Sequence, residues 1–126
     1  MNQRTATGLG IAFLGLVIAF LQYIASKHFL YWEFWWFDIV MHLLGGLLFA
    51  LTAYWFLRNE FRNLFNTRVI EFVFVLIFVM LVGVLWEVFE YVTGAYYAVN
   101  YSLDTTLDLI MDGVGVLVAF LVYKRL

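Results

Sequence analysis

Four apolar segments, each close to the length that crosses a bilayer, constrain the fold of this chain more than any other feature. They cover about Thr7 to Ala25, Asp38 to Leu57, Val69 to Val92 and Thr105 to Tyr123. A helix needs roughly 20 apolar residues to span the hydrocarbon layer. Because backbone polar groups in lipid must be satisfied within their own segment, such segments are helices. We therefore predict an all-α protein, a four-helix transmembrane bundle that forms a single integral membrane domain over residues 1–126.

The composition agrees with this class and narrows the partners. Hydrophobic residues make up 66% of the 126 residues, more than a soluble domain of this length could bury. The chain has no cysteine, so a metal site would need oxygen or imidazole ligands. The net charge of −2 is too small to indicate nucleic-acid binding. The expected partner is the lipid bilayer.

The basic residues predict how the bundle is oriented. Six of the seven lie before the first segment, between the second and third, or after the fourth: Arg4, Arg58, Arg62, Arg68, Lys124 and Arg125. Only Lys27 falls in the other connections. By the positive-inside rule, both termini are cytoplasmic in a multi-pass protein of the cell membrane. The outer connections, Phe29 to Phe37 and Tyr91 to Tyr101, are aromatic and suit the headgroup level, and the first is expected to include a short interfacial helix.

Acidic residues and one histidine occupy the outer ends of three segments. They form D-x-x-x-H, E-x-x-E and D-x-x-x-D-x-x-x-D patterns, which comprise Asp38 and His42, Glu87 and Glu90, and Asp104, Asp108 and Asp112. Spacings of three and four place each set on one helical face. With a rise of about 1.5 Å per residue, the three sets lie at a common depth. We expect them to face one another inside the bundle.

Small residues extend these polar faces and predict where the helices pack. The expected stripes are Gly8, Ala12, Gly15, Ala19, Gln22 and Ser26 on the first span, His42 and Gly45 on the second, Gly83, Glu87, Glu90 and Gly94 on the third, and Asp108, Asp112, Gly115 and Ala119 on the fourth. Acids on such a stripe avoid lipid, where a charge near the bilayer centre costs about 2.5 to 3.5 kcal/mol on insertion scales.

Helix capping explains some of the acids but not all. Asp104 is expected to cap the last helix, and Asp38 either caps its helix or belongs to the site. Glu87 and Glu90 lie at a C-terminal helix end, where the helix dipole disfavours an anion. Protonation, a hydrogen bond to His42 and a bound cation are the three ways to offset their charge. No lysine or arginine lies at this level of the sequence to pair with them.

The missing counter-charge favours a metal site. Carboxylates with one imidazole and no thiolate suit a divalent ion such as Mg, Mn, Fe, Ca or Zn. The expected ligands are His42, Glu87, Asp108 and Asp112. Glu90 or Asp38 is the expected proton acceptor if the site is catalytic.

The same motifs resemble those of a known family. The stretches "DIVMH" followed by "LLGG", "WEVFEY" and "LDLIMDGVGVLVAFL" are similar to those of small YjdF-type bacterial membrane proteins and, more distantly, of VanZ-like proteins. The similarity covers roughly residues 38–120 and implies that Asp38, His42, Glu87, Asp108 and Asp112 are the marked polar positions. It supports the fold and the site but implies no reaction.

Three functions remain open at this point. The first is a metal-dependent enzyme that acts on a lipid or lipid-linked substrate at the outer leaflet. The second is a cation or proton transporter or channel component, although the inner halves of the spans are almost purely apolar. The third is a non-catalytic assembly or lipid-sensing module. Four short helices bury little surface, which is compatible with a homodimer, although no sequence feature indicates one directly.

Overall fold

The computed structural model describes residues 2–61, 63–94 and 100–125, and these ranges are helical with short connections. The helices are α1 (Gln3–His28), α2 (Leu30–Glu33), α3 (Phe37–Glu60), α4 (Arg68–Thr93) and α5 (Tyr101–Arg125). All but α2 are long and apolar enough to cross a membrane. This confirms the all-α prediction with four spans. Arg62 and most of the second aromatic connection, residues 95–99, lie outside the described residues.

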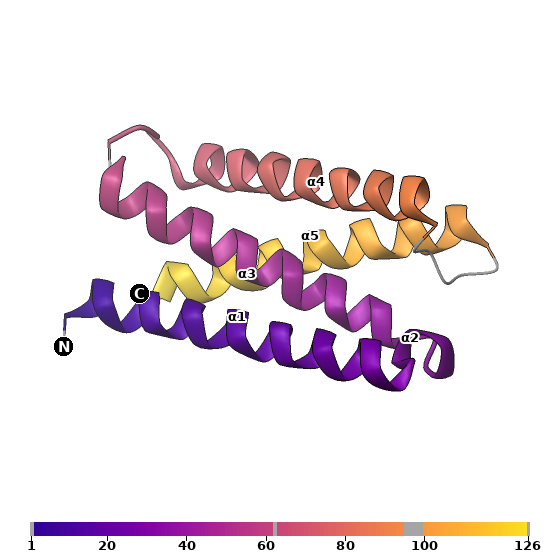
Figure 1. The fold of residues 1–126 in the computed structure, drawn as a ribbon. Coiled ribbons are helices and arrows are strands. Elements are labelled where there is room, and N and C mark those ends of the chain that lie inside the picture. The colour runs from indigo at the N-terminus through magenta and orange to yellow at the C-terminus, as the bar shows by residue number, and fades with distance from the viewer. Residues whose placement is uncertain (1, 62, 95–99, 126) are drawn as a thin grey trace.

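The long helices run antiparallel to their neighbours in sequence, so the start of α1, the end of α5 and the α3–α4 connection share one end of the molecule (Figure 1). α2, the start of α3 and the end of α4 lie at the other end, and we name the two ends inner and outer after the predicted orientation. The one-turn α2 lies within the first aromatic connection, where a short helix was expected. Which end faces the cytoplasm stays a prediction based on the basic residues.

The helix ends explain why the helices are longer than the apolar segments. The Asn2 side chain accepts from the Thr5 backbone N–H at 2.8 Å and caps α1. Thr67 caps α4 in the same way. Gly94 ends α4 with a φ of 71°, a left-handed conformation that glycine adopts without steric cost. These capping residues lie outside the apolar segments, so segment ends chosen by hydropathy alone make the helices too short.

Neither aspartate that was considered as a cap occupies a cap position. α5 begins at Tyr101, and the Asn100 side chain accepts from the Leu103 backbone N–H, so the predicted capping role of Asp104 is wrong. Asp104 lies in the first turn instead. α3 begins at Phe37 after Trp36, which makes no side-chain cap. Asp38 therefore also lies in a first turn, where the helix dipole favours its charge.

α3 is the central helix of the bundle. It packs against α1, α4 and α5, and α4 also packs against α5. In the described part of the chain, α1 packs against α3 and the short α2 but not against α4 or α5. Figure 1 shows α1 and α4 on opposite sides of α3. The core is thus formed mainly by α3, α4 and α5, and α1 is a peripheral helix.

The predicted packing stripe of α1 is only partly right. Gly8 and Gly15 face Trp55 and Leu48 of α3, but the other four members, Ala12, Ala19, Gln22 and Ser26, are exposed. The helix has one fully buried residue, Ala25. Because α1 has a single long neighbour, one narrow face suffices for its packing, and the remaining surface is apolar and faces outward.

α3 and α5 approach each other closely through glycine. A Cβ atom added at Gly46 would lie 2.5 Å from the Asp112 carbonyl oxygen, and one added at Gly115 would lie 2.5 Å from the Leu47 nitrogen. Added at Gly45, it would meet nothing within 4 Å. The packing stripe of α3 therefore passes through Gly46, and the expectation that it passes through Gly45 was wrong.

The other small residues of the stripe divide between packing and capping. Gly83, Gly115 and Ala119 are buried, as predicted. Gly94 is exposed, and its role is the C-cap of α4. Three of the four therefore lie where helices approach one another.

An apolar layer fills the inner half of the bundle. It consists of small and β-branched residues with at most 1% exposure: Ala50, Val75, Val79, Val116 and Ala119. Beyond it, at the inner end, the Arg58 guanidinium lies over the Tyr123 ring, 4.3 Å from its centroid, and 3.8 Å from a Glu71 oxygen. The layer separates this inner polar cluster from the acids at the outer end.

Candidate functional site

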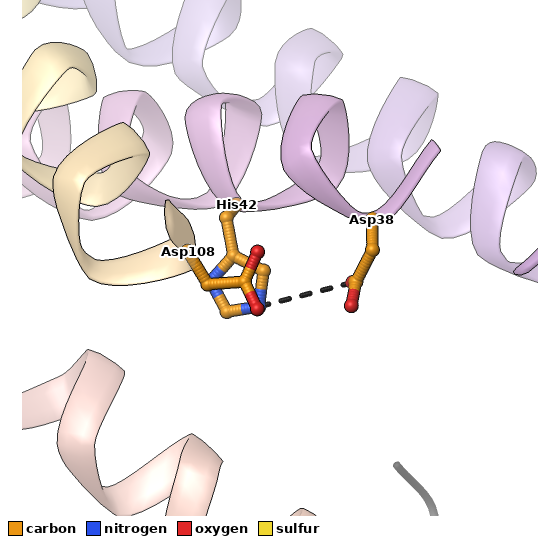
Figure 2. A group of neighbouring side chains, drawn as sticks. All are labelled: Asp38, His42 and Asp108. Carbon is orange, nitrogen blue, oxygen red and sulfur yellow. Dashed lines mark ion pairs between the residues drawn. The ribbon is translucent and has the colours of Figure 1, made fainter. Parts of the chain in front are cut away.

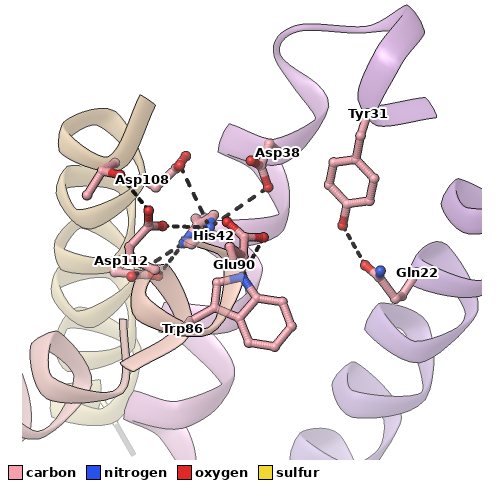
Figure 3. A network of polar contacts seen from close by, with 10 residues as sticks. Gln22, Tyr31, Asp38, His42, Trp86, Glu90, Asp108 and Asp112 are labelled. Carbon is pink, nitrogen blue, oxygen red and sulfur yellow. Dashed lines mark hydrogen bonds and ion pairs between the residues drawn. The ribbon is translucent and has the colours of Figure 1, made fainter. Parts of the chain in front are cut away.

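His42 is the centre of a buried polar cluster at the outer ends of α3, α4 and α5 (Figure 3). Its side chain is 7% exposed. Its Nε2 atom lies 3.8 Å from Asp38 Oδ1, 3.7 Å from Glu87 Oε1 and 3.9 Å from Asp108 Oδ2. Three helices thus place one carboxylate each around a single imidazole nitrogen, as the common depth of the motifs predicted.

The opposite ring nitrogen of His42 faces a fourth carboxylate. Its Nδ1 atom lies 3.4 Å from both oxygens of Asp112. In the tautomer with the proton on Nδ1, the ring donates a long hydrogen bond to Asp112. The lone pair on Nε2 then points toward Asp38, Glu87 and Asp108. In this tautomer, Asp112 holds the ring in an orientation that leaves Nε2 available as a ligand.

Several buried atoms of the cluster have no hydrogen-bond partner among the described residues. They are His42 Nε2, Glu87 Oε1 and both carboxylate oxygens of Asp108. The Asp108 side chain is fully buried. Leaving a buried polar group unpaired costs about 1 to 3 kcal/mol, and more when the group is charged. The cluster therefore needs either protons or a cation to be stable.

Glu87 has one satisfied oxygen and one free oxygen. The Thr105 hydroxyl donates to Glu87 Oε2 at 2.6 Å, and the Tyr101 hydroxyl donates to the Glu87 backbone carbonyl at 2.8 Å. Both donors belong to the first turns of α5. They hold the end of α4 against α5 and direct Oε1 of Glu87 toward His42.

Glu90 is buried but belongs to the edge of the cluster. Its carboxylate accepts from the Trp86 indole N–H, one turn earlier on α4, at 3.0 Å. Figure 3 shows Glu90 and the Trp86 ring beside His42, on the side that faces α1. No Glu90 oxygen is paired with His42 in the described part of the structure. Its expected role as proton acceptor stays a prediction.

The described residues supply no basic partner for these carboxylates. Both arginine ion pairs, Arg4 with Glu60 and Arg58 with Glu71, lie at the inner end. Lys27 is exposed and pairs with none of the acids within the described ranges. His42 is therefore the only cationic group that the described cluster can offer.

Three residues present ligand atoms close enough to share one ion. Asp38, His42 and Asp108 each contribute an atom, and these atoms lie within 4.8 Å of one another (Figure 2). Neighbouring ligand atoms around a tetrahedral zinc lie roughly 3.3 Å apart, given bonds of about 2.0 to 2.1 Å. The 3.8 and 3.9 Å distances from Nε2 exceed this by about half an ångström, so the two carboxylates would have to move toward the imidazole to bind one ion.

The positions of Asp38, Asp112 and Glu87 around His42 differ from those expected from the sequence. Asp38, expected as a proton acceptor, lies with His42 and Asp108 in the group that could share an ion. Asp112, expected as a ligand, contacts the other imidazole nitrogen. Glu87 lies 3.7 Å from Nε2 without completing that group. The roles themselves stay predictions.

The residues that support the acids were not among the candidate site residues predicted from the sequence. Thr105, Tyr101 and Trp86 each donate a hydrogen bond to Glu87 or Glu90. Thr105 could have been found, because it lies three residues before Asp108 and shares its helical face. Trp86 lies four residues before Glu90 and shares its helical face in the same way. Tyr101 carries no such signal, because it lies at the end of an aromatic connection.

Thr105→Val should destabilise the protein, because it leaves Glu87 Oε2 without its buried donor while keeping the side-chain shape. We expect a loss of about 1 to 3 kcal/mol in the free energy of unfolding. Thr106→Val is the matched control, since the Thr106 hydroxyl donates only to the Ser102 carbonyl of its own helix on an exposed face. Chemical unfolding of both variants in detergent micelles would measure the difference. Equal losses for the two variants would contradict the role of Thr105.

Comparison with known proteins yields a family but no activity. A family model described as "Predicted membrane protein (DUF2238)" matches residues 1–126. No curated protein and no solved structure gives a match. The match is consistent with the YjdF-type resemblance, while the more distant VanZ-like resemblance stays a prediction.

Proposed function

The chain belongs to this family of predicted membrane proteins, and we propose that it binds one divalent transition-metal ion in the outer half of its helical bundle. The proposed ligands are His42 Nε2 and the carboxylates of Asp38, Asp108 and Glu87. Asp112 orients the imidazole from the other side. An acidic group that accepts a hydrogen bond from the non-coordinating ring nitrogen of a ligating histidine is a recurrent support of metal sites.

One observation carries this proposal. His42 Nε2, Glu87 Oε1 and both oxygens of Asp108 are buried without hydrogen-bond partners, and Nε2 lies within 4 Å of both acids. A buried charge is tolerated when it is paired or coordinates a metal. A divalent ion among these atoms would satisfy several of them at once, whereas a protonated imidazole offsets one carboxylate only.

The surroundings favour a transition metal over magnesium or calcium. Mg²⁺ and Ca²⁺ prefer oxygen ligands, and Mg²⁺ usually keeps several waters. The imidazole ligand and the buried position of Asp108 suit Zn, Mn or Fe better. The absence of cysteine from the whole sequence removes the thiolate ligands of closed structural zinc sites.

A catalytic role would follow from the position of the site. A bound ion would supply Lewis acidity, which could polarise a carbonyl group of a lipid and activate water. We propose Glu90, which accepts a hydrogen bond from Trp86 beside His42, as the group that would accept a proton from such a water. Asp38 is assigned to the ion, so Glu90 is the better candidate of the two acids expected for this role.

Transport across the bilayer receives no support from the packing. Ala50, Val75, Val79, Val116 and Ala119 are at most 1% exposed and lie between the outer cluster and the inner end. The described core around this layer contains no acidic residue, lysine, arginine or histidine, and its polar groups are the hydroxyls of Tyr54 and Tyr123. An ion held at His42 would therefore have no polar path through one bundle.

Elemental analysis of protein purified in detergent without chelator tests the proposed site. We expect about one equivalent of Zn, Mn or Fe in the native protein and a loss of most of it in His42→Ala. His28→Ala is the matched control, because His28 is the other histidine of the chain and is exposed at the end of α1. A native protein without any divalent transition metal, before and after incubation with each ion, would refute the site.

A further inference from the structure

A partly open crevice of about 270 Å³ leads to His42 from the side of the bundle. α3 forms its floor through residues from Asp38 to Phe49, and α1 and α4 form its walls through Ile18 and Val79 among others. Because α1 and α4 are not in contact in the described structure, the crevice lies in the gap between two spans. In a membrane, this side of the crevice would open to the lipid around the bundle.

The lining of the crevice changes from apolar to polar along the bundle. The deeper part is lined by Ile18, Phe49 and Val79. Each of them lies further from the outer end of its helix than the polar lining residues of the same helix. The outer part is lined by Gln22, Tyr31, Asp38, His42, Trp86 and Asp112. Such a gradient matches a molecule with a hydrocarbon chain and a polar end.

The size of the crevice limits the occupant. Pockets that hold drug-sized ligands have volumes of about 300 to 1,000 Å³. A crevice of about 270 Å³ lies just below that range, so it has room for one hydrocarbon chain and not for two. Gly45 contributes to this room, because a Cβ atom added there would meet nothing within 4 Å.

The charges around the polar end select against an anion. The polar end of the crevice is lined by Asp38, His42 and Asp112, and no lysine or arginine is among its described lining residues. The carboxylates of Glu87 and Asp108 do not line the crevice, but they lie within 4 Å of His42 Nε2. The Trp86 indole N–H already donates to Glu90. A phosphate there would lack N–H donors from the protein and would lie beside several carboxylates, which repel it strongly in a desolvated site.

We propose that this crevice binds the single hydrocarbon chain of a lipid whose polar end is uncharged, such as a long-chain alcohol or a monoacylglycerol, and that this end reaches His42. This ligand class extends the proposed function of the same site. The role of His42 in binding the polar end rests on the metal ion proposed above. Access is lateral, from the bilayer between α1 and α4.

Photolabelling in phosphatidylcholine nanodiscs tests the crevice with the full chain. The probe is a long-chain alcohol that carries a diazirine in its chain, compared with the same chain ending in a phosphate. Mass spectrometry should find the alcohol attached to Ile18, Phe49 and Val79 more often than to Phe13, a residue of α1 that is 68% exposed and does not line the crevice. Labelling spread evenly over both sets would overturn the inference, as would stronger crevice labelling by the phosphate.

Filling the crevice gives the decisive comparison. Gly45→Leu should reduce crevice labelling about tenfold, because the added side chain occupies the space of the ligand chain. Gly10→Leu is the matched control, since Gly10 is exposed on α1 and its Cβ would also meet nothing within 4 Å. Gly45→Ala, which adds one methyl group to open space, gives a smaller loss and replaces the leucine variant if that one does not fold. Unchanged labelling in a folded Gly45 variant would overturn the inference.

Metal content measured on the same samples separates the two proposals. Gly45→Leu should keep its metal while it loses crevice labelling. If the native protein contains no metal but labels the crevice with the alcohol, the ion is wrong and the lipid crevice stands. If metal is present and crevice labelling is absent, the ion stands and the crevice is wrong.

Discussion

Asp108→Asn should abolish tight binding of the divalent ion while leaving the protein folded. Asp108 is fully buried, and neither of its oxygens has a hydrogen-bond partner among the described residues. Asparagine keeps the shape and can offer one neutral oxygen but no charge. Changes in residues that support metal ligands typically cost 10 to 100-fold in affinity, so loss of a charged ligand should exceed about 100-fold.

The same substitution distinguishes the metal site from a neutral polar core. Asparagine resembles a protonated aspartate, so Asp108→Asn should be nearly neutral for stability if the acids are held as neutral carboxyls. In a metal site, added ion should stabilise the native protein by about 2.7 kcal/mol at 100 times its dissociation constant, and this gain should vanish in the variant. Thermal unfolding with and without added Zn²⁺ or Mn²⁺ measures it. Equal metal-dependent stabilisation of native protein and variant would contradict a ligand role for Asp108.

Asp112→Asn provides the graded comparison within the same site. Asp112 contacts Nδ1 of His42 and not Nε2, so it should act through the orientation of the ring. We expect a loss of affinity of roughly 10 to 100-fold, smaller than that of Asp108→Asn. Glu33→Gln, an exposed change in α2, controls for the loss of one acid from the outer end. A larger effect at Asp112 than at Asp108 would reverse the two assigned roles.

Gly46→Ala should destabilise the bundle strongly, whereas Gly45→Ala should leave its stability unchanged or raise it. A Cβ atom at Gly46 would lie 2.5 Å from the Asp112 carbonyl oxygen and 2.7 Å from the Asp112 Cα, so α3 and α5 would have to separate. Overpacking of this kind costs about 1 to 3 kcal/mol, and more where backbone must move. The Gly45 position has open space, and alanine favours a helix over glycine by up to about 1 kcal/mol.

The two glycine variants differ by one residue in position and by nothing in chemistry, so each controls for the other. Circular dichroism during heating in the same detergent would compare their midpoints. Because Asp112 lies directly opposite Gly46, Gly46→Ala should also weaken metal binding by shifting the partner of His42. Equal midpoints for the two variants would show that α3 and α5 do not approach through Gly46.

The membrane-spanning architecture could be read from the sequence because its information is local. Within lipid, each span must satisfy its own backbone, so length and hydropathy suffice to find α1, α3, α4 and α5. The polar faces were predictable for the same reason, since helical spacing alone places Glu87 beside Glu90 and Asp108 beside Asp112. The helix ends were less accurate, because Asn2, Thr67 and Asn100 act through individual hydrogen bonds.

The pairing between helices could not be read in this way. Periodicity says which residues share a face but not how far each helix rotates about its axis or which neighbour it meets. The α1 stripe failed for this reason, since α1 meets a single long neighbour and leaves Ala12 and Ala19 exposed. The choice between Gly45 and Gly46 depends on the same rotation.

The sequence by itself determined that this chain is a four-span helical membrane protein with acids and one histidine gathered at one end, because the bilayer makes each span a local problem of length, polarity and helical spacing. Only the tertiary structure decided that His42 presents Nε2 to Asp38, Glu87 and Asp108 and Nδ1 to Asp112, and that a crevice reaches it between α1 and α4. These features depend on how each helix is rotated and how closely it approaches its neighbours, which side-chain packing and close glycine contacts decide and no pattern along one helix reveals.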